Sequence, residues 1–318
     1  MLLNENINAP EFVGLTNWLN LKSGKSELKL SDLRGNAVLV DFWTYTCINC
    51  IRTLPFITSW YEKYKDQGFV VVGVHTPEFE FEKKSKNVTS AVKRFGINYP
   101  VAQDNNYATW NSYANHYWPA EYLIDTQGKI RRIHFGEGEY DKTEMTIQLL
   151  LKRTGKRVDN GLICLPDQTP RLHLSPETYL GSERMAYYFP GGNVRNGTDE
   201  FDLTEYPERD SFSLGGRWTI TEDRATAKEG SVLTYNFYAE KVFLVMHPTG
   251  NKVAKIEVFL DNDRVAKTDW GKDVKGGVAT INSDRLYNLI DLKGAAENHI
   301  LKLVVAESEV ELFAFTFG

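Results

Sequence analysis

The sequence predicts an α/β domain followed by an all-β domain of the jelly-roll or β-sandwich kind. The chain has 318 residues, which is long for one hydrophobic core and natural for two domains. In its first half, apolar runs alternate with amphipathic segments, and this alternation indicates a sheet connected by helical crossovers. From about Val158 the pattern changes to short alternating runs separated by Gly, Asn and Asp turns, which is typical of an all-β domain.

The elements of the first domain follow from local patterns. Short apolar runs rich in β-branched residues predict strands, and apolar residues spaced three or four apart predict helices. Asp125-Thr126-Gln127-Gly128 lies between two apolar runs and predicts a hairpin turn. The expected strands cover 37–43, 69–74, 121–124 and 130–135, and the expected helices cover 51–65, 81–95, 105–113 and 142–153.

The second domain is expected to consist of short strands. These strands are predicted over 232–238, 242–246, 255–260, 277–281, 286–290, 300–305 and 310–317. Asp167-Gln168-Thr169-Pro170 and Ser175-Pro176 have the composition of a linker. The predicted division is therefore a first domain over 1–157, a linker over 158–172 and a β domain over 173–318.

Composition excludes several classes of function. The net charge of −5 gives no sign of a nucleic-acid-binding surface. No run approaches the roughly 18 apolar residues that a membrane helix needs. The start, Met1-Leu2-Leu3-Asn4-Glu5-Asn6, is too short and too polar for a signal peptide. The sequence therefore predicts either a cytoplasmic protein or a soluble piece of a longer one.

The cysteines indicate redox chemistry. Cys47 and Cys50 form a C-x-x-C pair directly after a predicted buried strand, at the start of the next helix. A helix N-terminus carries unpaired N–H groups and about half a positive charge, which stabilises a thiolate. Cys47 is therefore the expected nucleophile, and Cys50 is expected to resolve the mixed disulfide. Cys164 stands alone in the expected linker and is predicted to be a free or small buried thiol.

Two other uses of the pair stay open. A C-x-x-C can be half of a zinc site, but a structural site has four ligands, and the sequence has neither a second C-x-x-C nor suitably spaced His residues. Thr44 precedes Cys47 by three residues, as in a peroxidatic site, although that chemistry does not usually need a second cysteine so close. No metal is expected, and no cofactor other than the redox-active Cys47–Cys50 pair.

The residues around the pair resemble the thioredoxin family. The stretch 38–50, Val-Leu-Val-Asp-Phe-Trp-Thr-Tyr-Thr-Cys-Ile-Asn-Cys, is similar to the family's active-site strand and loop. The resemblance implies that Asp41 is the buried acid that assists deprotonation of the second cysteine. It also implies that Pro119 follows a cis peptide bond, which would place the backbone of Trp118 against the cysteines.

More of the chain resembles the DipZ family. Segments in both halves are similar to segments of its members, namely 43–55, 73–79, 117–125, 175–181, 286–287 and 313–318. That family fuses a CcdA-like membrane electron carrier to an extracytoplasmic TlpA/ResA-like thioredoxin domain and a carbohydrate-binding-module-like β domain. The resemblance therefore implies a reductase of protein disulfides in the periplasm or cell envelope, with a CcdA-like membrane electron donor and a role such as cytochrome c biogenesis.

The sequence departs from ordinary thioredoxins close to the pair. Thr46 replaces the usual Trp, Ile48-Asn49 replaces Gly-Pro, and Trp118 stands where a smaller residue is usual. Because the residues between the cysteines tune the reduction potential, the direction of electron flow stays open.

Further side chains are candidates for the site. Trp43 and Trp118 belong to the matching motifs, and Glu78 and Glu80 follow the second strand near the expected active-site edge. A buried carboxylate at that edge could exchange protons with Cys50, whereas a solvated charge is the simpler interpretation.

The β domain shows no nucleophile–base pair and no clustered metal ligands. Trp218, close to Gly215-Gly216, is expected in the core, whereas Trp270 beside Gly271 is the better candidate to stack on a sugar ring. Two function classes therefore remain. The first is a thiol–disulfide oxidoreductase that acts on extracytoplasmic protein disulfides, and the second is a binding or scaffold protein localised by its β domain.

Overall fold

The computed structural model describes residues 7–21, 24–155, 157–192, 194–250, 252–294 and 296–318. The chain divides into two compact units, Met1–Thr169 and Pro170–Gly318, and each is described by itself. The first six residues, whose polarity argued against a signal peptide, lie outside the described residues.

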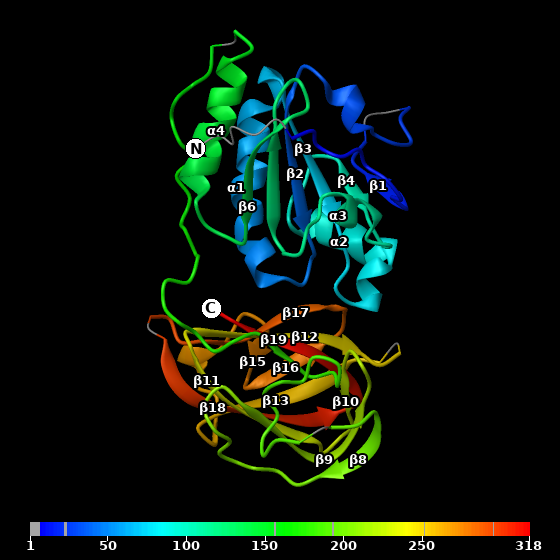
Figure 1. Cartoon of the computed structure of the whole chain (residues 1–318). Coiled ribbons are helices and arrows are strands. Elements are labelled where there is room, and N and C mark those ends of the chain that lie inside the picture. Colours follow the sequence, from blue (N-terminus) through cyan, green and yellow to red (C-terminus); the bar gives the residue numbers. More distant parts are fainter. Residues whose placement is uncertain (1–6, 22–23, 156, 193, 251, 295) are drawn as a thin grey trace. The chain divides into compact units, whose positions relative to one another are not determined.

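The first unit is an α/β domain built on one mixed sheet (Figure 1). Its six strands follow the order β1-β4-β3-β2-β5-β6, with β2, β3 and β4 parallel and the other neighbours antiparallel. The strands are β1 (Asn17–Leu19), β2 (Ala37–Trp43), β3 (Phe69–His75), β4 (Val101–Gln103), β5 (Ala120–Ile124) and β6 (Ile130–Phe135). The helices are α1 (Ile48–Tyr64), α2 (Ser85–Arg94), α3 (Ala108–Ser112) and α4 (Tyr140–Lys152).

The structure confirms the predicted strands and helices of this unit with small changes. The segment 81–95, expected to be one helix, is a 3₁₀ turn over Glu80–Lys83 followed by α2, because the extended backbone of Lys84 separates the two. Strands β1 and β4 were not predicted. Each has only three residues, which is too short for a strand pattern to appear.

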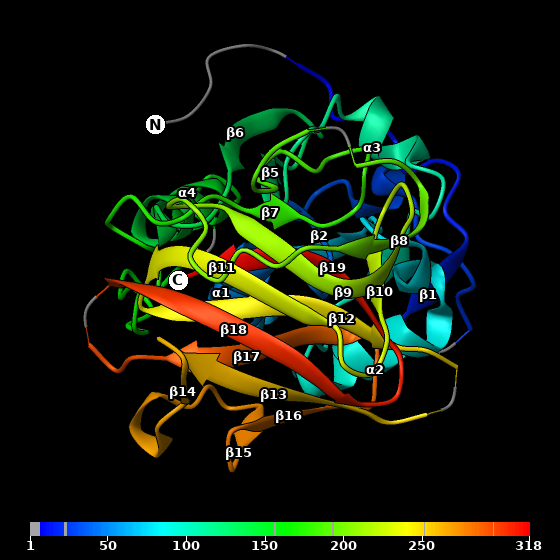
Figure 2. The same ribbon diagram turned by 90° about the horizontal axis from the view of Figure 1, so that it is seen from below.

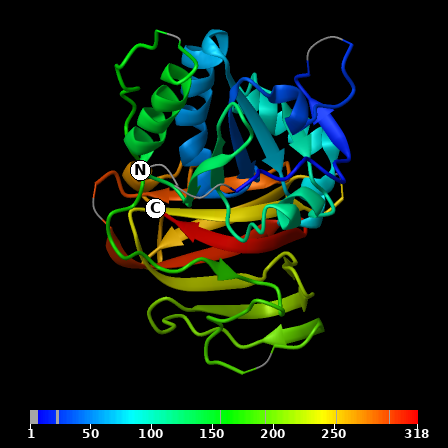
Figure 3. The ribbon, with the colours of Figure 1, turned by 45° about the horizontal axis from the view of Figure 1, so that its top comes forward.

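The two faces of the sheet are covered differently. Alternate residues of a strand point to opposite faces, so Val40 and Phe42 of β2 pack into the cluster that contains Trp110 of α3. Helices α1 and α4 run side by side (Figures 1 and 3), and Phe56 of α1 stacks on Tyr140 of α4 with 3.7 Å between the ring centroids. They contact β3 and β2, and the β2 residues that alternate with the Trp110 cluster include the buried Asp41.

The second unit is a near-barrel β-sandwich. Its path is β15-β16-β13-β18-β11-β9-β10-β19-β12-β17, and β7, β8 and β14 pair at the side of this path. Figure 2 shows β11, β18, β13, β16 and β15 following one another across the sheet. The strands are β7 (Thr178–Tyr179), β8 (Gly197–Phe201), β9 (Phe212–Ile220), β10 (Ala225–Ala227), β11 (Val232–Ala239), β12 (Lys241–Pro248), β13 (Ala254–Leu260), β14 (Asp263–Arg264), β15 (Val274–Lys275), β16 (Val278–Ile281), β17 (Arg285–Asp291), β18 (Glu297–Glu307) and β19 (Val310–Phe317).

Strand β9 joins the two layers of the sandwich. Its first part pairs with β11 and its second part pairs with β10. The change of partner falls at Gly215-Gly216. Gly216 has a φ of +77°, and a Cβ on Gly215 would come within 2.6 Å of the Leu203 side chain, so this bend requires both glycines.

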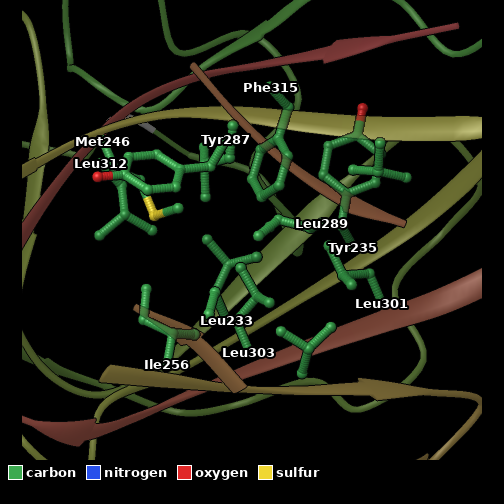
Figure 4. Close-up of a cluster of buried hydrophobic side chains, with 14 of the residues drawn as sticks. Leu233, Tyr235, Met246, Ile256, Tyr287, Leu289, Leu301, Leu303, Leu312 and Phe315 are labelled. Atoms are coloured by element: carbon green, nitrogen blue, oxygen red, sulfur yellow. The ribbon is translucent and has the colours of Figure 1, made fainter. Parts of the chain in front are cut away.

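The core of the sandwich is formed by apolar side chains from both layers (Figure 4). The labelled members are Leu233, Tyr235, Met246, Ile256, Tyr287, Leu289, Leu301, Leu303, Leu312 and Phe315. Trp218 is 1% exposed and belongs to this core, as predicted. Trp270 is half-buried, packs against the same core and donates its indole N–H to the carbonyl oxygen of Val265 at 2.9 Å.

The chain that follows α4 stays attached to the first unit. The backbone N–H of Ile163 donates to the Glu144 carboxylate at 2.7 Å, and the carbonyl oxygen of Gly161 accepts from the Gln148 amide at 3.2 Å. Glu144 is 1% exposed. Residues 158–163, which the sequence analysis assigned to the linker, therefore stabilise the contact surface of α4.

We expect a fragment over residues 1–169 to unfold at a higher temperature than one over 1–157. The shorter fragment loses these two hydrogen bonds and also those that Lys63 and Lys152 donate to Gly161 and Asn160, and it leaves Glu144 with one donor fewer, at a cost of about 2 kcal/mol. In a domain of this size that corresponds to about 5 °C. Thermal unfolding followed by circular dichroism measures the difference, with a fragment over 1–163 as the control that should match 1–169. Equal melting temperatures for 1–157 and 1–169 would contradict the prediction.

Candidate active site

Cys47 lies at the N-terminus of α1, directly after the loop that leaves β2. It is the N-cap residue of the helix, and its Sγ accepts a hydrogen bond from the backbone N–H of Cys50 at 3.3 Å. Cys47 is partly exposed, Cys50 is 1% exposed, and both are free thiols. The helix N-terminus, with its positive end of the helix dipole, therefore faces the sulfur that solvent can reach.

The loop before β5 lies against Cys47. The Trp118–Pro119 peptide bond is cis, as the resemblance implied, and the Cys47 thiol donates to the carbonyl oxygen of Trp118 with 3.8 Å between sulfur and oxygen. The indole of Trp118 donates to the carbonyl oxygen of Thr76 at 3.1 Å and packs against Trp110 with 4.3 Å between ring centroids. These contacts fix the Trp118 backbone beside the accessible sulfur.

Asp41 is buried in the middle of β2, opposite Glu121 of the antiparallel strand β5. Neither carboxylate oxygen of Asp41 has a hydrogen-bond partner among the described residues. Burial, and next the charge of Glu121, raise the pKa of Asp41 well above its usual range. Burial also raises the pKa of Glu121 to about 7, although the Thr143 hydroxyl donates to it at 3.2 Å.

Cys50 lies in the same buried environment. Burial, then the hydrogen bond with Cys47 and its charge, raise the pKa of the Cys50 thiol well above its usual range, and Asp41 adds to this rise. The phenol of Tyr99 belongs to the same group, because burial and the charges of Asp41, Cys50 and Glu121 raise its pKa. Cys50 therefore stays protonated until a base removes its proton, and Asp41 is a carboxylate placed to interact with it.

The buried acid at the end of β3 is Glu82. Glu80 is exposed and pairs with Lys83, and Glu78 is partly exposed. Glu82 is 0% exposed and accepts hydrogen bonds from the hydroxyls of Thr44 and Thr46, both at 2.6 Å. Burial raises its pKa to about 7. The sequence therefore indicated the right segment for a buried carboxylate but not the right residue.

Aromatic rings enclose His75 at the end of β3. Its ring stacks on Tyr45 with 5.6 Å between centroids and meets the edge of Trp43 at 5.2 Å. Burial lowers the pKa of His75 to about 3, so the ring is neutral at physiological pH. Trp43, a candidate from the motif, is thus part of the packing behind the loop rather than of its accessible surface.

Four residues of the site were not predicted from the sequence, namely Glu82, Glu121, Tyr99 and His75. A weak signal existed for two of them, because Glu121 is the lone charge in the run Ala120-Glu121-Tyr122-Leu123-Ile124 and Glu82 alternates with apolar residues after Phe79. A charged residue inside an apolar strand pattern either faces solvent or is buried with a role, and periodicity alone cannot distinguish the two.

Across the described ranges, no group of three or more His, Cys, Asp or Glu side chains is placed to hold a metal ion. Within the same ranges, no helix is both long enough and apolar enough to cross a membrane. Cys164 is an exposed free thiol, which fits the prediction of a free cysteine.

Thiol–disulfide exchange needs a reachable thiolate and a second thiol one helical turn away, and the first unit supplies that geometry on a thioredoxin fold. The unit is therefore a thioredoxin-like thiol–disulfide oxidoreductase domain. Over 134 residues the chain is 30% identical to the thiol–disulfide oxidoreductase ResA of Bacillus subtilis (strain 168), covering 42% of this chain and 69% of that protein. The chain belongs to the DipZ/ResA-like thioredoxin family.

Other comparisons cover both units. The AhpC/TSA family matches residues 8–133, and the family described as "Thioredoxin like C-terminal domain" matches residues 175–318. Protein DipZ of Mycobacterium bovis is 45% identical over 246 residues, which is 76% of this chain but only 35% of the length of that relative. A thioredoxin-like protein solved in solution in its oxidized form aligns at 26% identity with a TM-score of 0.43, over 48% of this chain and 99% of that one.

We expect Asp41→Asn to raise the stability of the reduced protein at and above neutral pH. The raised pKa means that folded Asp41 holds a proton that the unfolded chain loses at lower pH, so its contribution to stability disappears as the pH rises through the folded pKa. Asparagine cannot ionise, so the variant should exceed the wild type by on the order of 2 kcal/mol at about pH 8 and by less at about pH 5.

Urea unfolding at a series of pH values measures this difference. Asp66→Asn is the matched control, because Asp66 is exposed and its removal should leave the pH dependence unchanged. Parallel stability curves for Asp41→Asn and the wild type would show that Asp41 is not held protonated by the fold.

Proposed function

We propose that this chain reduces protein disulfides outside the cytoplasm through the Cys47–Cys50 pair. The observation that carries the proposal is the unequal placement of the two sulfurs. Cys47 caps α1, is partly exposed and lies beside the Trp118 carbonyl, whereas Cys50 is buried one turn later. An extended substrate segment could pair with the backbone at Trp118 and bring its disulfide to Cys47.

The reaction then takes two exchange steps. The Cys47 thiolate attacks one sulfur of the substrate disulfide, a mixed disulfide forms, and the second substrate sulfur leaves as a thiolate that takes up a proton. Asp41 in its ionised form accepts the proton of Cys50, Cys50 attacks the Cys47 sulfur, and the first substrate sulfur leaves as a thiolate that takes up a proton. The substrate gains two electrons and two protons, and the chain retains the Cys47–Cys50 disulfide.

A membrane electron donor of the CcdA-like class would return the pair to the dithiol. The resemblance to DipZ supports such a donor and an extracytoplasmic location, since the DipZ relatives extend well beyond the matched part. The β-sandwich would dock a partner or help to position substrates. A sugar-binding role for Trp270 stays a weaker proposal, because its indole is half-buried and already hydrogen-bonded to Val265.

We expect Cys47→Ser to abolish reduction of insulin and Cys50→Ser to accumulate mixed disulfides with its substrate. The first variant removes the attacking sulfur, and the second removes only the sulfur that resolves the intermediate. Insulin turbidity and non-reducing electrophoresis measure the two effects, and Cys164→Ser is the control that should keep the wild-type rate. Reduction by Cys47→Ser at the wild-type rate would end the proposal.

The reduction potential of the pair should lie near −270 mV, the order found for reducing thioredoxins, and not near about −120 mV. The reason is that a pair that reduces protein disulfides must itself have a more negative potential than an oxidising pair. Equilibration with glutathione or dithiothreitol buffers, followed by alkylation and mass spectrometry, gives the value. A potential at the oxidising end would reverse the direction of electron flow.

Peroxide reduction is the second candidate, favoured by the match to the AhpC/TSA family over residues 8–133. The Thr44 hydroxyl, which precedes Cys47 by three residues, donates to Glu82 at 2.6 Å and is thereby engaged away from peroxide chemistry. Consumption of hydrogen peroxide by Cys50→Ser with dithiothreitol, at a rate above that of insulin reduction by the wild type, would favour the peroxidase.

A further inference from the structure

Both carboxylate oxygens of Glu82 accept hydrogen bonds. Oε1 accepts from the hydroxyls of Thr44 and Thr46 at 2.6 Å each, and Oε2 accepts from the backbone N–H groups of Glu78 and Phe79 at 2.6 and 3.0 Å. We call this arrangement the Glu82 clamp. It joins the loop that ends in Cys47 to the segment that follows β3.

The same segment also holds the other side of the site. The Thr76 carbonyl accepts from the Trp118 indole at 3.1 Å, and the Pro77 carbonyl accepts from the Tyr107 hydroxyl. The residues after β3 therefore connect the loop before Cys47 with the loop before Pro119. A change in the clamp would alter the position of Cys47 relative to the Trp118 carbonyl.

We propose that Glu82 is a positioning residue for disulfide exchange, which holds Thr44 and Thr46 so that Cys47 caps α1. The inference rests on the proposed function for its biological meaning, but its geometry concerns only the reactivity of Cys47. Thr46 directly precedes Cys47 and is itself 1% exposed, so the clamp acts within one residue of the attacking sulfur.

The clamp contributes to reactivity in two ways. Its hydrogen bonds fix the loop, which keeps the Cys47 sulfur at the donor N–H of Cys50. Once Glu82 ionises, its carboxylate also places a negative charge at Thr46, the residue before Cys47, and a negative charge near a thiol disfavours the thiolate. Since burial raises the pKa of Glu82 to about 7, this second effect begins near neutral pH.

Other titratable groups face Glu82 from the neighbouring elements. His75 contacts the Thr44 hydroxyl at 3.4 Å, but its pKa is lowered to about 3 and it stays neutral. Burial raises the pKa of Tyr107 to about 12, so it also stays neutral. Glu78 and Glu80 are the nearby carboxylates on the same segment, and the charge of Glu78 adds to the rise in the pKa of Glu82.

The test follows alkylation of Cys47 by iodoacetamide against pH in the reduced full chain. All variants carry Cys164→Ser, because Cys164 is exposed and would also react, whereas Cys50 is buried. Glu82→Gln can keep the clamp, since its amide oxygen can accept the two backbone N–H groups while its NH₂ donates to the two hydroxyls. Glu80→Gln removes a charge from the same segment without touching the clamp and serves as the matched control.

A plot of the wild-type alkylation rate against pH should change slope near pH 7 as Glu82 ionises. Glu80→Gln should keep that change of slope. Glu82→Gln should react at the wild-type rate below neutral pH and faster than the wild type above it. Glu121, whose pKa is also about 7, is present in every variant, so it contributes equally to all profiles and cancels in the ratio of variant to wild-type rates. A ratio for Glu82→Gln that stays constant through pH 7 would overturn the assignment.

A second pair of variants tests positioning without altering charge. Thr46→Val removes the hydroxyl that Glu82 binds, and alkylation of Cys47 should slow about fivefold as the sulfur leaves its position at the helix N-terminus. Thr46→Ser restores the hydroxyl and should return the rate to that of the wild type. Thr46→Val with a wild-type rate at every pH would show that the clamp is only structural.

The alkylation experiment also separates this inference from the proposed function. Iodoacetamide reacts with Cys47 without any disulfide substrate, so the pattern of rates does not depend on reductase activity. A chain that shows the expected pattern but fails to reduce insulin would refute the proposed function alone. A chain that reduces insulin but shows no difference among the Glu82 and Thr46 variants would refute the inference alone.

Discussion

Desolvation of carboxyl groups around the cysteine pair is the constraint on which the rest of the site depends. Asp41, Glu121 and Glu82 are each nearly inaccessible to solvent, and burial raises the pKa of all three. A buried carboxylate is costly unless it is hydrogen-bonded or takes up a proton. Both solutions occur in this site. Glu82 is hydrogen-bonded and acts on the loop that ends in Cys47, whereas Asp41 takes up a proton and interacts with Cys50.

The two solutions separate the roles of the carboxylates. Glu82 receives four hydrogen bonds from the loop and the segment that it joins, so its main effect is to hold Cys47 in place. Asp41 lacks a hydrogen-bond partner among the described residues and interacts electrostatically with Cys50, so it is suited to exchange a proton. In the proposed reaction, Glu82 therefore positions the nucleophile Cys47, and Asp41 exchanges a proton with the resolving thiol of Cys50.

The features that depend only on neighbouring residues in the chain could be predicted from the sequence. An apolar strand, a C-x-x-C pair and an amphipathic helix placed Cys47 at a helix N-terminus, and resemblance supplied the cis bond before Pro119. The sequence could not reveal Glu121 as part of the site, because the position of Glu121 opposite Asp41 depends on the register between β5 and β2. Strand β9 was not predicted either, since Gly215-Gly216 interrupts the alternation of apolar residues where the strand changes partners.

The separation of roles also bears on the order of events. Cys47 and Cys50 lie on one turn of α1, yet only Cys47 is both at the helix N-terminus and accessible, so attack on a substrate must begin there. Cys50 becomes a nucleophile only when its proton leaves, and the nearby Asp41 can take it up only while it is itself ionised. Because burial and Glu121 hold Asp41 in its protonated form, resolution rather than attack is the step that this environment slows. In the proposed reaction a slow second step would lengthen the life of the mixed disulfide, and backbone pairing at Trp118 would hold the substrate while Cys50 is deprotonated.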